Sequence, residues 1–444
     1  MVRRLTLVEY QTCPAVPLAP HERDALLRLV PSITVVPSLQ VVSDERGHAC
    51  YDLTPGSWIG AVRLGTLAIE IRPKLPVDRV LFLISYAIDP RAWRDLLFHF
   101  AETTSLVEAI VPAFLAHVRR AIRHGLLHGY RAEEGAWPAV RGRLRFDEQV
   151  RRRFGVFPPA ELRYDEYTAD VDENRLLKVA LVRLSRMRLR SPATARALRH
   201  DLAAFQDVSL VHDRPDQWPP LRYTRLNEHY RPALELARLI VRSTAFDLGH
   251  GPVPAWAFLV DMNQVFEDFV VVALREALGL SERTFPQGLA SGARPRTLPL
   301  DQAGAVHLKP DLSWWDGNTC TFVGDVKYKR ASVAGIEHPD LYQLLAYTIA
   351  TGLPGGLLVY AAGEAEPASH EVVHAGKELH VTALDLSGSP DKILAQIGGV
   401  AAHVRHLRGL ARAGAARGGP PSPRERPSAA APPPIAAAGA APRP

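Results

Sequence analysis

Two aspartates and a lysine stand close together between residues 305 and 330. Asp325 and Lys327 are two positions apart, so on a β-strand both side chains project from the same face. Asp311 follows Pro310 on the preceding alternating run. Two such carboxylates bind a hard divalent ion such as Mg²⁺ and leave positions for water and phosphate. Because the ion lowers the pKa of its water, and a nearby lysine orients or deprotonates that water or stabilises the transition state, the pattern indicates phosphodiester hydrolysis.

The three residues are expected on the two arms of a β-hairpin. Asp316-Gly317 separates two alternating runs and is a strong signal for a two-residue turn. The runs predict strands over residues 306–315 and 318–329, and pairing of these strands brings Asp311 within a side-chain length of Asp325. Lysine is rare in this chain: of 53 basic residues seven are lysines, and three of them fall within residues 309–329. A compact point charge is not interchangeable with arginine, so this segment is the most informative one.

Two predicted helices flank the hairpin and carry further polar residues. Residues 258–278 show an apolar helical pattern with Glu267 in the middle, where a purely structural helix rarely places a carboxylate. In the helix predicted over residues 340–351, Gln343 and Tyr347 are four apart and share one face. They are candidates for contacting DNA or fixing the lysine. An isolated Asp-x-Lys is most often a solvated pair, but the ordered combination favours a site.

Overall charge says little about partners. The 444-residue chain has a net charge of +6, and residues 412–444 supply +4 of it with five arginines and one glutamate. Ten arginines against four acidic residues lie between positions 119 and 153. Such a stretch either follows a phosphate backbone or forms a solvated face, and both interpretations stay open.

Several classes of protein are excluded. The three distant cysteines, at positions 13, 50 and 320, rule out a disulfide scaffold and a cysteine-rich zinc module, and they predict a reducing, cytoplasmic location. No apolar run approaches the roughly 20 residues that a bilayer requires, so no membrane interaction is expected. The pattern Gly-x₄-Gly-Lys-Ser/Thr does not occur. A step driven by nucleotide hydrolysis would therefore need an external motor.

The pattern along the chain divides it into four regions. Residues 1–160 are β-rich with helices, and their clearest element is a hairpin over residues 62–72 that turns at Gly65-Thr66. Residues 161–250 are helical, and the acidic residues Asp170, Asp172 and Glu173 are interpreted as caps of a long helix. Residues 251–412 hold the candidate site. Residues 413–444 are rich in alanine and proline and are expected to be disordered.

The order of the site residues resembles the PD-(D/E)xK nuclease superfamily, and more closely its McrC family. Outside the site, the resemblance rests on two groups of motifs. The first is Arg63-Leu-Gly with Ile69-Glu-Ile-Arg-Pro-Lys74 and the apolar helix that follows. The second is Arg141-Gly-Arg-Leu with Tyr164-Asp-Glu-Tyr-Thr and Glu173-Asn-Arg-Leu-Leu-Lys178. The resemblance covers residues from about 1 to 400 and leaves out the tail.

The resemblance implies a multidomain α+β and α/β chain, with an N-terminal β-rich domain, a helical extension and a C-terminal restriction-endonuclease-like domain whose mixed sheet is flanked by helices. It implies that Asp311 and Asp325 are the Mg²⁺ ligands and Lys327 the catalytic lysine, with Glu267 and Gln343 at supporting positions. It also implies two partners: double-stranded DNA carrying modified cytosine, and a McrB-like AAA+ GTPase that forms a hexameric ring. In that family the N-terminal half plugs into the ring and stimulates GTP hydrolysis.

Two other functions remain open at this stage. One is a non-catalytic adaptor that activates the GTPase and only binds DNA. The other is a stand-alone DNA repair or recombination nuclease of the same superfamily. The presence of Asp311, Asp325 and Lys327 together favours the nuclease subunit. His124 and His128 are four apart on a predicted helix, but no third ligand is apparent, so a zinc site is not expected there.

Overall fold

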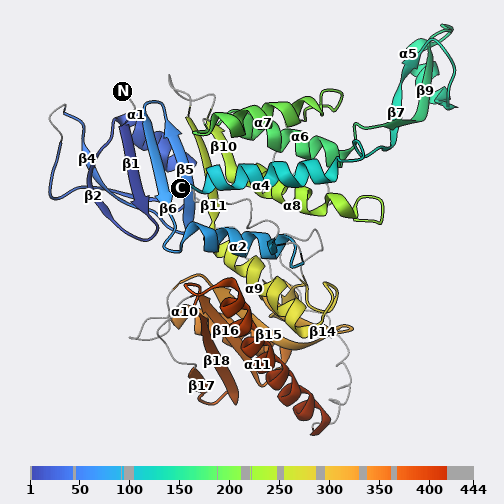
Figure 1. Cartoon of the computed structure of the whole chain (residues 1–444). Coiled ribbons are helices and arrows are strands. Elements are labelled where there is room, and N and C mark those ends of the chain that lie inside the picture. Colours follow the sequence, from blue (N-terminus) through green and yellow to red (C-terminus); the bar gives the residue numbers. More distant parts are fainter. Residues whose placement is uncertain are drawn as a thin grey trace, which may run out of the picture.

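The computed structural model describes residues 3–43, 47–91, 93–94, 105–187, 189–211, 221, 223–247, 255–286, 296–329, 338–361 and 368–417. These residues form an N-terminal sheet, a group of helices beside it, a projecting arm, and a second sheet with its own helices (Figure 1). None of the described helices is long and apolar enough to cross a membrane.

The N-terminal sheet has five strands in the order β1-β6-β5-β11-β10. Strand β1 pairs parallel with β6, and the other neighbours pair antiparallel. The predicted hairpin is confirmed, because β5 and β6 pair on either side of Gly65, whose φ is +57°. Strands β5 and β11 lie so close at Gly60 that a Cβ there would stand 2.0 Å from the Phe258 carbonyl oxygen. The bounds are β1 Arg3–Val8, β5 Trp58–Leu64, β6 Leu67–Arg72, β10 Thr244–Asp247 and β11 Ala255–Asp261.

A smaller antiparallel sheet and one helix accompany this sheet. The smaller sheet has the order β2-β4-β3. Leu26 of α1 packs with Leu7, Leu53 and Ile69 in one buried cluster, which joins the helix to both sheets. The bounds are β2 Cys13–Pro17, α1 Pro20–Leu29, β3 Thr34–Pro37 and β4 Cys50–Thr54.

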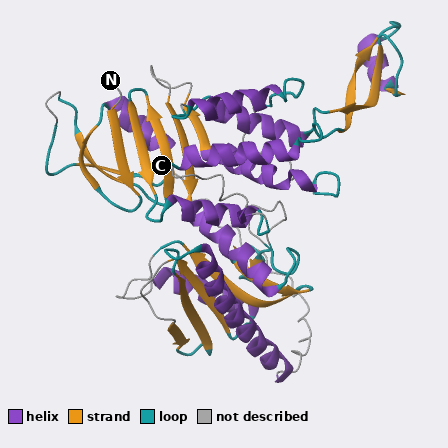
Figure 2. Cartoon of the chain, viewed as in Figure 1, coloured by secondary structure: helices purple, strands orange, loops and turns teal. Residues whose placement is uncertain are grey.

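Helices from residues 77–243 pack beside the N-terminal sheet (Figure 2). Their apolar faces are buried in one large cluster that also takes in α9 of the C-terminal part. The apolar pattern of the sequence also predicts a helix over residues 91–101, most of which lie outside the described residues. The bounds are α2 Val77–Ile88, α4 Leu106–Ala121, α6 Asp172–Ser185, α7 Pro192–Ala203, the short 3₁₀ helix η2 Glu228–Tyr230, and α8 Arg231–Ser243.

An arm projects from the helices (upper right in Figure 1). It is a three-stranded antiparallel sheet, β7-β9-β8, with the short helix α5. The bounds are β7 Gly129–Trp137, β8 Arg143–Leu144, α5 Phe146–Arg153 and β9 Ala160–Thr168. Tyr130, Phe146, Phe154 and Tyr167 are all more than 60% exposed, which is unusual for so many aromatic side chains on one small element.

Many arginines of the stretch from residue 119 to residue 153, which runs from α4 into the arm, form ion pairs. At least six of its ten arginines pair with acidic side chains: Arg119 with Asp201, Arg131 with Asp170, Arg145 with Glu134, Arg151 and Arg152 with Glu148, and Arg153 with Glu161. Arg141 instead stacks on Tyr164, 3.7 Å from the ring centroid. Most of these charges are therefore neutralised locally, which favours the paired, solvated face over a path for phosphates.

The root of the arm is fixed by Asp170. The interpretation of Asp170, Asp172 and Glu173 as caps was wrong, because Val171 occupies the N-cap of α6 and no side chain caps that helix. Asp170 instead accepts hydrogen bonds from Arg175 at 2.8 Å, from Ser209 and from Arg131 of β7. The Arg175 hydrogen bonds, with those from Ser209 and Arg131, hold the pKa of this carboxyl well below its usual range.

Asp170→Asn is expected to lower the free energy of unfolding by about 3 kcal/mol at pH 7, because it leaves the guanidinium groups of Arg131 and Arg175 without their shared counter-charge. Since the folded-state pKa of Asp170 is depressed, its contribution is present above the unfolded-state pKa of about 3.9 and is lost as pH falls below that value. Urea denaturation at pH 7 and at pH 3 checks this. An equal difference between variant and wild type at both pH values would contradict it.

The second sheet is mixed, with the order β14-β15-β16-β18-β17. The three central strands are parallel, and both edge strands pair antiparallel. Alternate residues of β16 face opposite layers: Leu357 and Val359 pack in the cluster that contains α9 and α11, whereas Leu358 and Tyr360 pack with α10. The bounds are α9 Met262–Leu278, β14 Leu312–Asp316, β15 Thr319–Lys327, α10 His338–Thr351, β16 Gly355–Ala361, β17 Ala368–Val372, β18 Lys377–Leu384 and α11 Pro390–Arg417.

Two predicted elements of this part differ from the structure. The strand predicted over residues 306–315 is divided into β13 (His307–Leu308) and β14, because Pro310 has no N–H to donate to a neighbouring strand. The two-stranded pair β12 (Leu298–Pro299) and β13 lies apart from the second sheet. The helix predicted from residue 258 begins only at Met262, because residues 255–261 pair with β5.

The predicted division at residue 250 falls between β10 and β11, which are neighbours in the N-terminal sheet. Strand β11 thus belongs to the N-terminal sheet, although it directly precedes α9 of the C-terminal part. Helix α11 continues to Arg417, past the expected start of the tail at residue 413. The remaining tail, from residue 418, lies outside the described residues.

Candidate active site

Strand β15 carries two of the three residues singled out in the sequence. Asp325 and Lys327 alternate with buried apolar residues and project from the same face. The Lys327 Nζ lies 2.6 Å from Oδ2 of Asp325, and the Asp325 side chain is only 1% exposed. The fixed spacing along one strand is sufficient to form this ion pair.

Asp311 reaches the same place from the other arm of the hairpin. It directly precedes β14, and its Oδ2 accepts a hydrogen bond of 3.0 Å from the backbone N–H of Val326. Val326 lies between Asp325 and Lys327, so this bond places the Asp311 carboxylate beside both. The turn at Gly317, whose φ is +60°, sets the pairing, and Asp316 faces Thr319 across it.

The carboxyl groups strongly perturb one another. Burial, followed by the charges of Asp325 and Glu267, raises the pKa of Asp311 to about 9. Burial also raises the pKa of Glu267, on α9, to about 7, and the charges of Asp268 and Asp325 add to this effect. Such shifts mean that several acids are held together with too little positive charge nearby.

Lys327 supplies part of the missing charge. Burial lowers its pKa, but the Asp325 and Asp311 carboxylates outweigh burial and raise the pKa above the ordinary value of a lysine. The side chain is therefore an ammonium ion at neutral pH. A lysine in this state donates hydrogen bonds and stabilises negative charge.

The donor set suits a hard cation that keeps water in its coordination shell. Within the described part of the chain, neither oxygen of Asp325 accepts a hydrogen bond of acceptable geometry, although Lys327 lies beside it as an ion pair. The described residues hold no group of three or more histidine, cysteine and acidic side chains suited to a metal ion. Mg²⁺ typically takes one or two carboxylates and completes its shell with water and substrate oxygen, which matches Asp311 and Asp325.

Gln343 and Tyr347 lie on α10, on the side of the sheet that Asp325 faces. Tyr347 is 2% exposed, and its hydroxyl donates to the Lys309 carbonyl at 2.9 Å and accepts from Gln343 Nε2 at 2.8 Å. Burial, followed by the charges of Asp325 and Asp311, raises the pKa of Tyr347. Tyr347 thus holds the segment that leads into Asp311, while Gln343 is exposed at the rim; their part in substrate binding stays a prediction.

Sequence reasoning missed two contributors to this geometry. One is the Val326 N–H, since a backbone donor leaves no trace in residue types. The other is Asp340 at the start of α10, which lies 2.9 Å from Lys329 Nζ and accepts a 2.7 Å hydrogen bond from Tyr360. Lys329 belongs to the lysine-rich segment, so the unusual density of lysines was a usable signal for this second ion pair.

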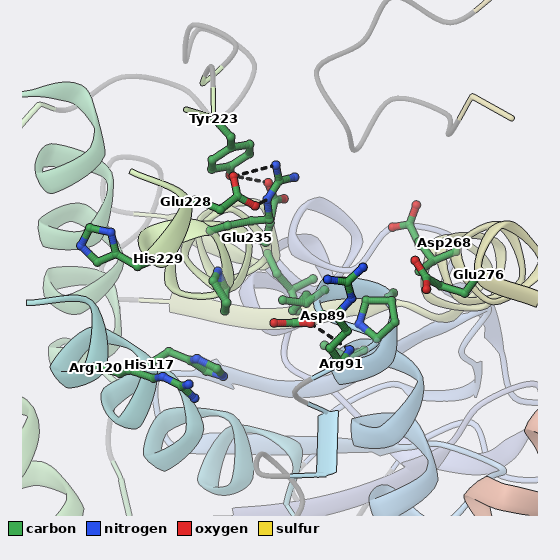
Figure 3. Close-up of a pocket in the computed structure, with 18 of the residues that line it drawn as sticks. Asp89, Arg91, His117, Arg120, Tyr223, Glu228, His229, Glu235, Asp268 and Glu276 are labelled. Carbon is green, nitrogen blue, oxygen red and sulfur yellow. Dashed lines mark hydrogen bonds and ion pairs between the residues drawn. The ribbon is translucent and has the colours of Figure 1, made fainter. Parts of the chain in front are cut away.

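A separate cavity of about 880 Å³ lies between helices and does not include Asp311, Asp325 or Lys327. In Figure 3, Asp268 and Glu276 of α9 lie across it from His117 and Arg120 of α4. Arginines and acidic residues are mixed around its wall, so the cavity has no single charge. His124 lines it, whereas His128 stacks on Tyr167 of the arm.

Comparison with known proteins places the chain. Residues 53–361 match the family model of the McrBC 5-methylcytosine restriction system component. No curated protein matches the chain. The chain is similar to a refined half-complex from a tetradecameric assembly of Thermococcus gammatolerans McrB AAA+ hexamers with bound McrC, with 16% identity, a TM-score of 0.52, and coverage of 90% of this chain and 100% of that one.

A second similar structure is the cryo-EM structure of the Thermococcus gammatolerans McrBC complex, with 19% identity, a TM-score of 0.40, and coverage of 62% of this chain and 88% of that one. The family match extends over well more than half of the chain and includes both the N-terminal hairpin and the candidate active site. The chain therefore belongs to the family of McrBC 5-methylcytosine restriction system components.

Proposed function

We propose that the protein is the endonuclease subunit of a GTP-dependent restriction complex that cuts DNA carrying modified cytosine. The observation that carries this proposal is the meeting of Asp311, Asp325 and Lys327 at one end of the hairpin. This arrangement is the one expected for a PD-(D/E)xK nuclease domain, and the mixed sheet flanked by α9, α10 and α11 is consistent with that fold. Membership of the restriction family supports the choice of DNA as substrate.

In this proposal Asp311 and Asp325 hold Mg²⁺, which supplies a water of lowered pKa and neutralises charge on the phosphate. The buried position of Asp325 excludes bulk water from one side of the reacting phosphate, which strengthens every charge interaction there. Lys327, held as an ammonium ion, orients the attacking water and stabilises the additional negative charge of the transition state. Glu267 contributes a further carboxyl group beside them.

The partner in this proposal is a McrB-like AAA+ GTPase, because a similar solved structure holds McrB AAA+ hexamers with bound McrC. We assign the contact with the ring to the N-terminal half, and within it to the arm. The arm stands away from the body and exposes Tyr130, Phe146 and Phe154, and aromatic side chains are the residues that protein interfaces favour.

The test is cleavage of supercoiled plasmid with Mg²⁺ and GTP. Methylated and unmethylated plasmid are compared, with and without a McrB-like AAA+ GTPase. Cutting of methylated plasmid that needs the partner and GTP is the expected result. Cutting without the partner would favour a stand-alone nuclease. Faster GTP hydrolysis by the partner without any cutting would favour the adaptor.

A further inference from the structure

Two polar contacts, one buried and one partly buried, join the N-terminal sheet to the two elements that carry residues of the candidate active site. One lies at the end of β15 and the other at the start of α9. Each joins residues more than 200 positions apart in the chain. Neither contact takes part in the proposed chemistry, so its position beside catalytic residues calls for a separate explanation.

The first contact is centred on Glu9, directly after β1. Tyr328 directly follows Lys327, so its side chain projects to the opposite side of β15. The Tyr328 hydroxyl donates to Oε1 of Glu9 at 2.9 Å, and both side chains are at least 98% buried. The backbone N–H of Lys74 donates to the same oxygen at 3.0 Å, and Lys74 Nζ lies 3.9 Å from the centroid of the Tyr328 ring. Lys74, the last residue of the motif Ile69-Glu-Ile-Arg-Pro-Lys74, therefore contacts Tyr328, which follows Lys327 in the chain.

Placing Glu9 here costs free energy. Burial raises its pKa, even though the hydrogen bonds from Lys74 and Tyr328 oppose the shift. Within the described residues, its second oxygen, Oε2, is buried without a hydrogen-bond partner. A valine or leucine would fill the space without that penalty. We therefore explain the Glu9 carboxylate by the groups that it binds, the Tyr328 hydroxyl and the Lys74 N–H, and not by a contribution to the stability of the fold.

The second contact holds the start of α9, five residues before Glu267. The Ser57 hydroxyl, from the loop before β5, donates to Oδ1 of Asp261 at 2.8 Å and accepts from Asn263 at 2.8 Å. The Ser57 carbonyl accepts from the Met262 N–H at 3.0 Å. Asp261 in turn caps α9. The same N-terminal sheet therefore fixes both the helix with Glu267 and the strand with Lys327.

We propose that Glu9 is a positioning residue that acts through Tyr328 to set where Lys327 stands relative to Asp311 and Asp325. This inference rests on the proposed nuclease function. It makes the N-terminal sheet the frame against which the catalytic strand is aligned.

The first experiment measures partner-dependent cleavage of methylated plasmid by Tyr328→Phe, Glu9→Ala and the double variant. Each single variant is expected to lower kcat about tenfold or more at unchanged KM, because small displacements of a catalytic group are costly. The double variant should lose no more than either single variant, as two residues of one contact do. Glu9→Gln keeps both hydrogen bonds to Oε1 and should restore most of the rate lost in Glu9→Ala.

Tyr230→Phe is the matched control for Tyr328→Phe. It also removes one buried tyrosine hydroxyl, which accepts from the Leu127 N–H at 2.8 Å, but it lies among the helices away from β15. Stimulation of GTP hydrolysis by the partner should be unchanged in the Glu9 and Tyr328 variants. Full cleavage by Tyr328→Phe, or an equal loss in Tyr230→Phe, would overturn the proposal.

The second experiment does not depend on cleavage. The seven lysines give seven backbone signals in a spectrum of protein labelled with ¹⁵N-lysine, and Lys327→Arg identifies the signal of interest. Glu9→Ala should shift the Lys327 signal although the two residues are far apart in the chain, and Glu9→Gln should shift it much less. An unmoved Lys327 signal in Glu9→Ala overturns the positioning role. If the wild-type protein never cuts DNA, the proposed function is wrong. The spectrum still tests whether Glu9 sets the position of Lys327.

Discussion

Lys327→Ala is expected to lower partner-dependent cleavage of methylated DNA by at least about 100-fold, because it removes the ammonium group that lies against the Asp325 carboxylate. Stimulation of GTP hydrolysis in the partner should persist, since Lys327 lies on β15, far along the chain from the arm. The fold should also persist, because the amino group is at the rim of the site and the strand keeps its backbone pairing. Single-turnover cleavage with saturating partner and GTP measures the effect.

Lys329→Ala is the matched control. Lys329 lies two residues further on and pairs with Asp340 at 2.9 Å, so its loss removes an ion pair with Asp340 and leaves the one between Lys327 and Asp325 in place. Cleavage by this variant should fall by less than about tenfold, in keeping with the small worth of a partly exposed ion pair. If Lys327→Ala cuts DNA as fast as Lys329→Ala, the catalytic role assigned to Lys327 is wrong.

Asp311→Asn is expected to act in opposite directions on the metal-free and the metal-bound protein. Without metal, the substitution removes one of two crowded, buried carboxyl groups while its amide oxygen still accepts from the Val326 N–H, so the melting temperature should rise. With Mg²⁺, the variant lacks one ligand, and the affinity should fall at least about tenfold. Isothermal titration calorimetry and melting curves at several Mg²⁺ concentrations measure both effects.

Asp316→Asn serves as the control for Asp311→Asn. Asp316 lies in the same hairpin, but its carboxylate pairs with Arg408 and Arg412 at 2.7 and 2.6 Å, not with the candidate site. Its removal should leave Mg²⁺ binding unchanged and lower the melting temperature slightly. Equal Mg²⁺ affinity in wild type and Asp311→Asn would place the metal elsewhere in the protein.

Local signals were enough to predict the core of the candidate site. Asp325 and Lys327 share a face because a strand has a period of two, and Asp316-Gly317 marks the turn that brings Asp311 alongside. These relations need fewer than 20 residues of chain. The helical position of Glu267 followed in the same way from the apolar period of the surrounding residues.

Features that depend on distant partners could not be predicted. Residues 258–260 are apolar enough to begin a helix, and they form a strand only because β5, about 200 residues earlier, offers a free edge. Asp170 has the residue type and the position expected of a helix cap, yet its carboxylate forms an ion pair with Arg131 of the arm. The contact between Glu9 and Tyr328 joins residues 319 positions apart, and no pattern in either segment marks the other.

The strand order β1-β6-β5-β11-β10 limits which segments of this protein can be replaced by those of a relative. A recombination event near residue 250 would pair β11 of one parent with β5 of another. The side chains of the two strands would then have to fit each other, and β5 would need a glycine at position 60, where the strands come closest. A fragment that starts at residue 251 would instead expose the edge of β11, which invites aggregation. Chimaeras of this protein are therefore expected to fold only when residues 1–261 come from a single parent.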